Sequence, residues 1–205
     1  MRSTIVLQVN SNIDPTPSIV SLLENTTKPN VFCIIARDNI DSRTSETVKV
    51  FLKNCCDNGN YTEEFNTNYT VATKIKDGLK LVYIVLKNYT GPDINKFAFD
   101  YFKEETDIYI TANSSNVYQN KFIEKHVNKF DNPFVGAVYS DYIRNGKYIY
   151  LSSIHPLINH QIEIGDLSFN SNLLKHLKTG DTGDIINTAY SQSLVRHIPE
   201  AIFLT

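Results

Sequence analysis

The residues of this chain that could carry chemistry gather where apolar runs end. Asp38 follows the run VFCIIA, the polar triplet 113–115 (Asn-Ser-Ser) follows DIYITA, and Asp141 follows FVGAVYS. The carboxyl ends of parallel strands meet at one edge of an open α/β sheet, and ligands bind there. The spacing therefore predicts one polar site that is assembled from segments far apart in the sequence.

Further acids and one lysine lie at predicted loop and helix ends. Asp166, in IGDLSF, and Asp141 are expected to line the side of the site that receives an acceptor. Asp181 and Asp184 lie at the start of a predicted helix that Ile185 and its neighbour begin. A carboxylate there can accept a proton from a substrate hydroxyl, and it can equally cap the helix. Both roles are compatible with Asp184.

The elements that must position these residues alternate between strand and helix. Strands are predicted over 3–11, 31–36, 80–88, 107–112, 134–142 and 147–154, the last after the hairpin signal Asn145-Gly146. Helices are predicted after Pro17, with Thr16 as the cap, and over 45–57, from Gly91-Pro92, over 122–130, 169–177 and 184–194, before a short strand at AIFL. Residues 57–72 are expected to form a loop, with a short helix near 70–77 as an option. This alternation predicts a mainly parallel sheet with helices on both faces.

The segment 118–142 resembles the core of the inverting glycosyltransferases with the GT-A fold, the large family 2-like group. FIEKHVNKF and NPFVGAVYSDY follow that family's pattern of a helix and then "NP.VG.VYSDY". The ending KTGDTGDIIN…IPEAIFL resembles the family's "GEDYDLWLRLA…IPEPLYLY". The resemblance implies a single GT-A-like (Rossmann-like) domain over residues 1–205. It implies transfer of a hexose-type sugar from a nucleoside diphosphate sugar to a hydroxyl, with inversion.

The resemblance also implies a role for individual residues. Asp38, in IIARDNID, takes the place of the aspartate that binds the nucleobase, although a turn or cap explains it as well. Lys96 takes the place of a basic residue that faces the diphosphate beside a helix start, and an ordinary surface lysine is the simpler explanation. Asp184, with Asp181 close by, takes the place of the catalytic base.

Asn113 and Ser115 stand where the family has an Asp-x-Asp motif that holds Mg²⁺ or Mn²⁺ on the diphosphate. Neutral amide and hydroxyl oxygens bind these cations more weakly than carboxylates do. Three outcomes stay open: a weak metal site completed by the phosphates, stabilisation of the leaving group by basic residues, or loss of transfer activity.

Composition sets the remaining expectations. The net charge of −2 gives no general reason to expect nucleic-acid binding. No apolar run approaches the roughly 18 residues of a transmembrane helix, and the N-terminus does not read as a signal peptide. The odd set Cys33, Cys55 and Cys56 indicates a reducing, cytoplasmic compartment. Frequent Asn, Ile and Lys, with no Trp, suggest AT-rich coding, as in a virus or a low-GC bacterium.

The main rival to an enzyme is a non-catalytic GT-A-like domain that binds a nucleotide sugar or serves an assembly. The missing Asp-x-Asp favours this rival, and the retained Asp38 and Asp184 oppose it. A nucleotidyltransferase is disfavoured because its glycine-rich, basic phosphate loop is absent from the sequence. The acceptor stays open between a glycan, a lipid-linked sugar, a protein and modified DNA, and the oligomeric state is not indicated.

Overall fold

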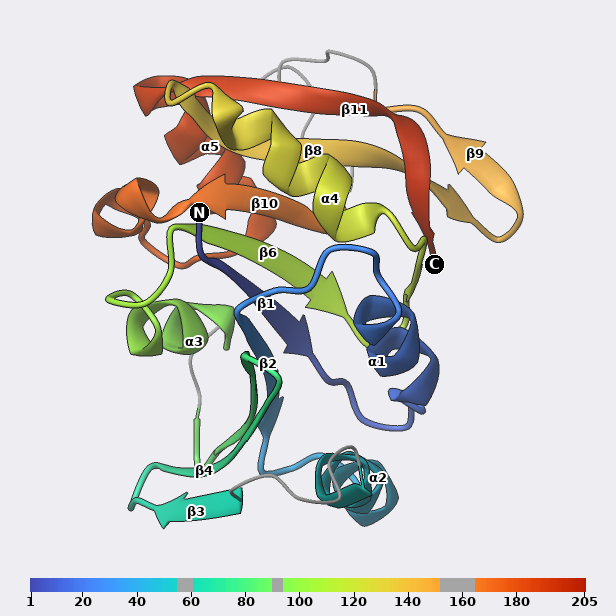
Figure 1. The fold of residues 1–205 in the computed structure, drawn as a ribbon, viewed down its shortest axis with the longest axis vertical. Helices are drawn as coiled ribbons and strands as arrows, with labels where there is room; N and C mark the ends of the chain where they lie inside the picture. Colours follow the sequence, from blue (N-terminus) through green and yellow to red (C-terminus); the bar gives the residue numbers. More distant parts are fainter. Residues whose placement is uncertain (55–60, 90–93, 152–164) are drawn as a thin grey trace.

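The structure, a computed structural model, describes residues 1–54, 61–89, 94–151 and 165–205. These residues form one mixed sheet of eleven strands, with helices packed on its faces (Figure 1). Ten of the strands follow the order β3-β4-β5-β2-β1-β6-β10-β8-β11-β7, and β9 pairs with β8. In the described residues, no helix is both long and apolar enough to cross a membrane.

The strands are β1 (Ser3–Gln8), β2 (Val31–Arg37), β3 (Tyr61–Phe65), β4 (Tyr69–Lys76), β5 (Leu79–Leu86), β6 (Ile108–Asn113), β7 (Val117–Tyr118), β8 (Val135–Arg144), β9 (Lys147–Ile149), β10 (Leu167–Asn170) and β11 (Leu194–Leu204). The α-helices are α1 (Thr16–Leu23), α2 (Ser42–Asn54), α3 (Asn95–Tyr101), α4 (Phe122–Val127) and α5 (Thr182–Gln192). Two 3₁₀ helices are η1 (Asn128–Asp131) and η3 (Ser171–His176).

The centre of the sheet is parallel, as the sequence predicts. β5, β2, β1 and β6 pair side by side in one direction. The continuous apolar runs in β1 and β2 are fully buried because helices cover both faces. Figure 1 shows α4 in front of β8 and β10, and α5 behind them. The predicted α/β fold class, a sheet between two helical layers, is confirmed.

β10 joins the two halves of the sheet. It lies antiparallel between β6 and β8, so that β8 and β11 run in the same direction as the parallel centre. The start of β10 therefore lies at the edge where β6 and β8 end. This reversal brings the residue before β10, Asp166, to the predicted site.

The loop predicted over 57–72 is wrong where the structure describes strands, at 61–65 and 69–72, and the short helix near 70–77 is wrong as well; residues 57–60 lie outside the described residues. β3 and β4 form an antiparallel hairpin that adds to β5 at the edge of the sheet. The turn from β4 to β5 is Asp77-Gly78, with φ of 50° and 82°, and such an Asp-Gly pair is a strong hairpin signal.

Other boundaries differ from the prediction. The first two residues of the helix predicted over 169–177 belong to strand β10, and the 3₁₀ helix η3 covers residues 171–176. β8 continues to Arg144, so Asp141 lies within the strand. Thr16 does not cap α1; its N–H donates to Asp14 Oδ1 at 2.9 Å. The Asn145-Gly146 turn is confirmed, with φ of 50° and 74°. Cys55, Cys56, Gly91, Pro92 and residues 152–154 lie outside the described residues.

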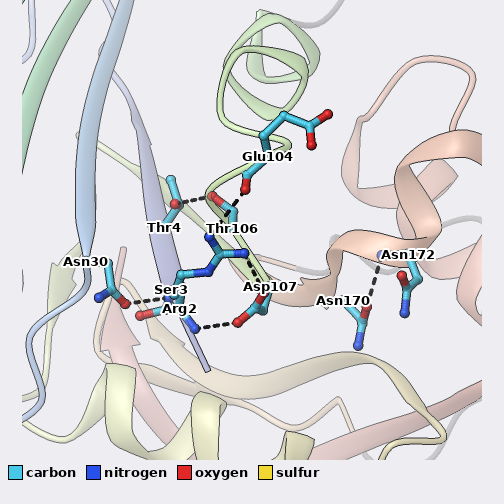
Figure 2. Close-up of polar contacts among 9 residues, drawn as sticks. All are labelled: Arg2, Ser3, Thr4, Asn30, Glu104, Thr106, Asp107, Asn170 and Asn172. Atoms are coloured by element: carbon cyan, nitrogen blue, oxygen red, sulfur yellow. Dashed lines mark hydrogen bonds and ion pairs between the residues drawn. The ribbon is translucent and has the colours of Figure 1, made fainter.

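Polar contacts fasten the starts of the central strands, at the edge opposite the predicted site (Figure 2). Arg2 donates from its backbone N–H to Asp107 Oδ2 at 2.7 Å and forms an ion pair with Oδ1 at 3.1 Å. The Thr4 and Thr106 hydroxyls share a buried hydrogen bond of 2.6 Å. These contacts fix the register of β1 against β6 and so the positions of the strand ends that carry the site.

Candidate functional site

A cleft of about 550 Å³ opens at the carboxyl edge of the sheet. It is lined by Asn113, Ser115, Asn116, Tyr142, Arg144, Asn145, Gly165, Asp166, Thr182 and Thr205. β6, β8, β10 and α5 each bring residues to it at or next to their ends, as expected for a ligand site in an open α/β sheet. The structure thus brings together three predicted site residues, Asn113, Ser115 and Asp166, beside the start of α5.

The elbow after β6 is held by its own hydrogen bonds. Asn113 Oδ1 accepts from Asn10 Nδ2 at 3.1 Å, from Ser115 N–H at 3.0 Å and from Ser115 Oγ at 2.9 Å. The Ser18 hydroxyl fixes the backbone beneath by donating to the carbonyls of Ser114 and Asn116. The elbow is therefore a preorganised wall of the cleft.

Asp166 is the buried carboxyl of the cleft. Its Oδ2 accepts from the Tyr118 hydroxyl at 2.5 Å and from Asn116 Nδ2 at 2.6 Å. Burial raises the pKa of Asp166 to about 6, although these hydrogen bonds act to lower it. Burial and the Asp166 charge raise the pKa of Tyr118 well above its ordinary value, so the phenol stays a donor. A carboxyl group in a cleft whose pKa lies near 7 can exchange protons at physiological pH.

Two features place Asp166. Gly165 passes the Phe203 ring so closely that an added Cβ would lie 2.4 Å from Phe203 Cζ. Tyr118, in the two-residue strand β7, pairs with Phe203 in β11 and packs beside that ring. The Asp166 carboxylate thus follows a backbone that packs closely on the Phe203 ring and contacts the buried Tyr118 hydroxyl.

Asp181 and Asp184 organise the start of α5. Asp181 is the N-cap, and its Oδ1 accepts from Asp184 N–H at 2.8 Å. Asp184 Oδ2 accepts from the backbone N–H groups of Lys178, Thr179 and Gly180 at 2.7, 2.8 and 3.0 Å. Burial acts to raise the pKa of Asp184, but these three donors outweigh it and the pKa lies below its ordinary value. The geometry supports the helix-start role of both acids.

Asp38 and Lys96 do not line the cleft. Asp38 is exposed at the end of β2, and its Oδ2 accepts from Asn88 N–H at 3.0 Å, in a turn where Asn88 has φ of 52°. Lys96 pairs with Asp100 at 2.6 Å and lines a separate hollow with Lys103 and residues of η3. Their predicted contacts with a nucleotide stay predictions.

Asp141 is buried on β8, with 2% of its surface exposed. Its Oδ1 accepts from Leu151 N–H and lies 2.8 Å from His197 Nε2, and its Oδ2 accepts from the Tyr148 hydroxyl at 3.2 Å. This carboxylate therefore fastens β9 and β11 to β8. An acceptor-side role for Asp141 remains a prediction.

The elbow does not fit a divalent cation. Mg²⁺ and Mn²⁺ prefer charged oxygens, and Asn113 Oδ1 is neutral and already accepts three hydrogen bonds. Within the part of the chain that the structure describes, no three His, Cys, Asp or Glu side chains come together as a metal site.

The sequence reasoning missed Asn116, Tyr118 and Arg144. Asn116 and Tyr118 lie in the four residues after the elbow, and the sequence prediction was limited to the polar triplet 113–115. Arg144 ends β8 and lies just before the hairpin turn that the sequence did predict. A longer β8 would have revealed it, because Tyr142 and Arg144 then share one face with period two.

No protein-family model and no curated protein sequence matches this chain. The arrangement of the sheet does match solved structures, and it defines an α/β protein with a GT-A-like fold. Residues 1–349 of Staphylococcus aureus TarS align with 100% of this chain and 60% of that one, with a TM-score of 0.67 and 13% identity. The same fragment in complex with UDP-GlcNAc gives a TM-score of 0.67 at 13% identity, with 100% of this chain and 58% of that one covered.

A longer TarS structure aligns with 100% of this chain over 36% of its own length, with a TM-score of 0.65 and 13% identity. The chain thus spans 60% or less of each of these structures. At such identities the likeness establishes the fold, and the fold that the sequence resemblance implied is confirmed.

Proposed function

We propose that this chain transfers a sugar from a nucleoside diphosphate sugar to a hydroxyl acceptor, with inversion. The observation that carries the proposal is the cleft in which the elbow of Asn113 and Ser115 faces Asp166, a carboxyl with a pKa near 6. The GT-A-like fold supports it, since TarS structures of this fold include complexes with UDP-GlcNAc and with UDP. The reaction is proposed to take place in the cytoplasm.

The proposed chemistry is a single displacement. The acceptor oxygen attacks the anomeric carbon, and the bond from that carbon to the diphosphate oxygen breaks with its electron pair going to the diphosphate. The acceptor proton passes to Asp166. With a pKa near 6, Asp166 is mostly ionised at pH 7 and is basic enough to take up a proton. Positioning of donor and acceptor in the cleft supplies the remaining acceleration.

Asp166 is a better candidate for the base than Asp184. Both side-chain hydrogen bonds to Asp166 converge on Oδ2, so Oδ1 is the proposed proton acceptor. Asp184 has a lowered pKa and one oxygen committed to three backbone donors. Thr182, beside Asp181, lines the cleft and is proposed to contact the acceptor.

The alternative function is a domain that binds a nucleotide sugar without transferring it. The commitment of Asp184 to the backbone and the neutral elbow favour this alternative. It retains the cleft and predicts binding without turnover. The acceptor, whether a glycan, a lipid-linked sugar, a protein or modified DNA, is not specified by the lining residues.

The experiment measures UDP release from UDP-GlcNAc and other UDP-sugars, with a panel of acceptors, together with UDP binding by calorimetry. Asp166→Asn is compared with the wild type and with Asp131→Asn, which changes an exposed acid in η1. We expect the wild type to turn over and Asp166→Asn to lower the turnover by at least about 100-fold. Asp166→Asn should still bind UDP, and Asp131→Asn should be as active as the wild type. Binding with no turnover would support the alternative. Equal turnover in all three proteins would remove Asp166 from the mechanism.

A further inference from the structure

We infer that this chain binds the diphosphate of its donor without a divalent cation, and that Arg144 supplies the positive charge in its place. The inference rests on the proposed function and names how that same cleft recognises its ligand. Two observations support it: the occupied oxygen atoms of the elbow, and the positive charge of Arg144 among the residues that line the same cleft.

The elbow is built to bind its own chain. An amide oxygen has two lone pairs, and Asn113 Oδ1 already receives donors from Asn10 and from both the N–H and the hydroxyl of Ser115. The Ser115 hydroxyl donates inwards, to Asn113 and to Asn116 Oδ1 at 3.2 Å. A cation would have to break this arrangement and would gain only neutral ligands.

Asp166, the nearest acid, does not replace the carboxylates that the elbow lacks. Asp166 is a single carboxylate, and its Oδ2 is already bound by Tyr118 and Asn116. The other acids near the start of α5 hold its backbone. A hard divalent cation would therefore find one partly occupied carboxylate where such sites use charged oxygens.

The opposite wall carries the charge that an anion needs. Arg144 and Asn145 line the cleft together with the elbow. Arg144 lies directly across the hairpin from Lys147, so two cationic residues lie at this end of the hairpin. The guanidinium fork also matches phosphate oxygens in a bidentate manner that an ammonium cannot reproduce.

In the displacement, the negative charge grows on the diphosphate oxygen as the bond to the anomeric carbon breaks. Arg144 holds that oxygen or its neighbours and needs no proton transfer to do so, because its guanidinium stays protonated. Asp166 takes up the acceptor proton on the other side of the sugar. The charge balance of the step is then met by residues of this chain.

The test measures UDP binding by calorimetry, with uridine as the ligand that lacks the diphosphate. Wild-type protein is stripped with EDTA and assayed with EDTA or with Mn²⁺. We expect the same Kd for UDP in both buffers. Arg144→Gln is expected to weaken UDP binding about 10- to 100-fold, as for a lost hydrogen bond to a charged group, and to leave uridine binding unchanged. Arg144→Lys should restore part of the loss.

Two further proteins complete the design. Lys175→Gln, which removes a cation from the hollow at the opposite edge, is the matched control and should bind UDP like the wild type. The double variant Asn113→Asp/Ser115→Asp is expected to acquire Mn²⁺-dependent UDP binding that the wild type lacks. Thermal unfolding of each variant checks that it is folded.

The outcomes distinguish a failure of the metal-free binding by Arg144 from a failure of the proposed function. Wild-type binding of UDP that disappears with EDTA and returns with Mn²⁺ would overturn the metal-free inference and leave the proposed function in place. An equal loss of UDP and uridine binding in Arg144→Gln would overturn the role of Arg144. Failure of the wild type to bind UDP or any UDP-sugar in either buffer would overturn the proposed function itself.

Discussion

Two buried groups, His126 and Asp166, are expected to have opposite effects on how the free energy of unfolding depends on pH. Burial lowers the pKa of His126 to about 3 and raises that of Asp166 to about 6. His126 Nδ1 lies 2.7 Å from the Ser168 hydroxyl, and its Nε2 has no partner among the described residues. Both groups are buried, so their shifts act on folding free energy at nearly full strength.

Lowering the pH decreases stability through His126 and increases it through Asp166. The unfolded chain protonates His126 below pH 6.5 while the folded protein does not, so this contribution to stability is present above pH 6.5 and is lost as pH falls towards 3. From pH 7.5 to 5.0 the loss is about 2 kcal/mol. The folded protein protonates Asp166 more readily than the unfolded chain, whose pKa is 3.8. Over the same interval the protonation of Asp166 restores about 1 kcal/mol of stability.

Between pH 7.5 and 5.0 these two groups should therefore change the free energy of unfolding of the wild type by less than about 1 kcal/mol. In Asp166→Asn the opposing effect of Asp166 is absent, so the loss of stability caused by His126 should be measurable. The variant is expected to be more stable than the wild type by about 3 kcal/mol at pH 7.5 and by about 2 kcal/mol at pH 5.0. Urea unfolding at both pH values, followed by far-UV circular dichroism, measures these differences, and titration of other groups cancels between the two proteins. A constant difference between variant and wild type would refute the raised pKa of Asp166.

Three more outcomes are expected. Gly165→Ala should cost about 1–3 kcal/mol because its Cβ meets the Phe203 ring, and calorimetry should show weakened UDP binding; full binding would mean that the ring can move. Thr4→Val should cost about 1–2 kcal/mol in urea unfolding by removing the buried hydrogen bond to the Thr106 hydroxyl, and Thr106→Val should cost less in that variant than in the wild type; additive losses would contradict the pairing. Asp184→Asn should lower stability by about 1 kcal/mol with kcat nearly unchanged, whereas a fall of about 100-fold or more would mark Asp184 as the base.

The sequence predicts the parallel centre well because its strands are continuous apolar runs and its helices have clear stripes. It fails at the β3–β4 hairpin, whose residues 62–65 are exposed. An exposed edge strand has no hydrophobic alternation, so only the Asp77-Gly78 turn signalled it. It also fails at β10, because a four-residue strand next to a 3₁₀ helix has the apolar spacing of one short helix.

The site was predicted in part for a related reason. The elbow follows β6 and Asp166 directly precedes β10, and residues at strand ends can be predicted from sequence. The partner of Asp166, Tyr118, lies in a two-residue strand that exists only because β11 passes beside it. The depressed pKa of Asp184 comes from three backbone N–H groups, and backbone direction has no signature in residue types.

The position of β10 has a consequence for how the chain reaches its folded state. β10 (Leu167–Asn170) is inserted between two strands that come earlier in the chain. Until it arrives, β6 and β8 both present unpaired edges, and such edges recruit other chains. Nascent chains or fragments that end before residue 167 are therefore expected to aggregate. The cleft, whose lining residues extend from Asn113 to Thr205, would be the last part to assemble.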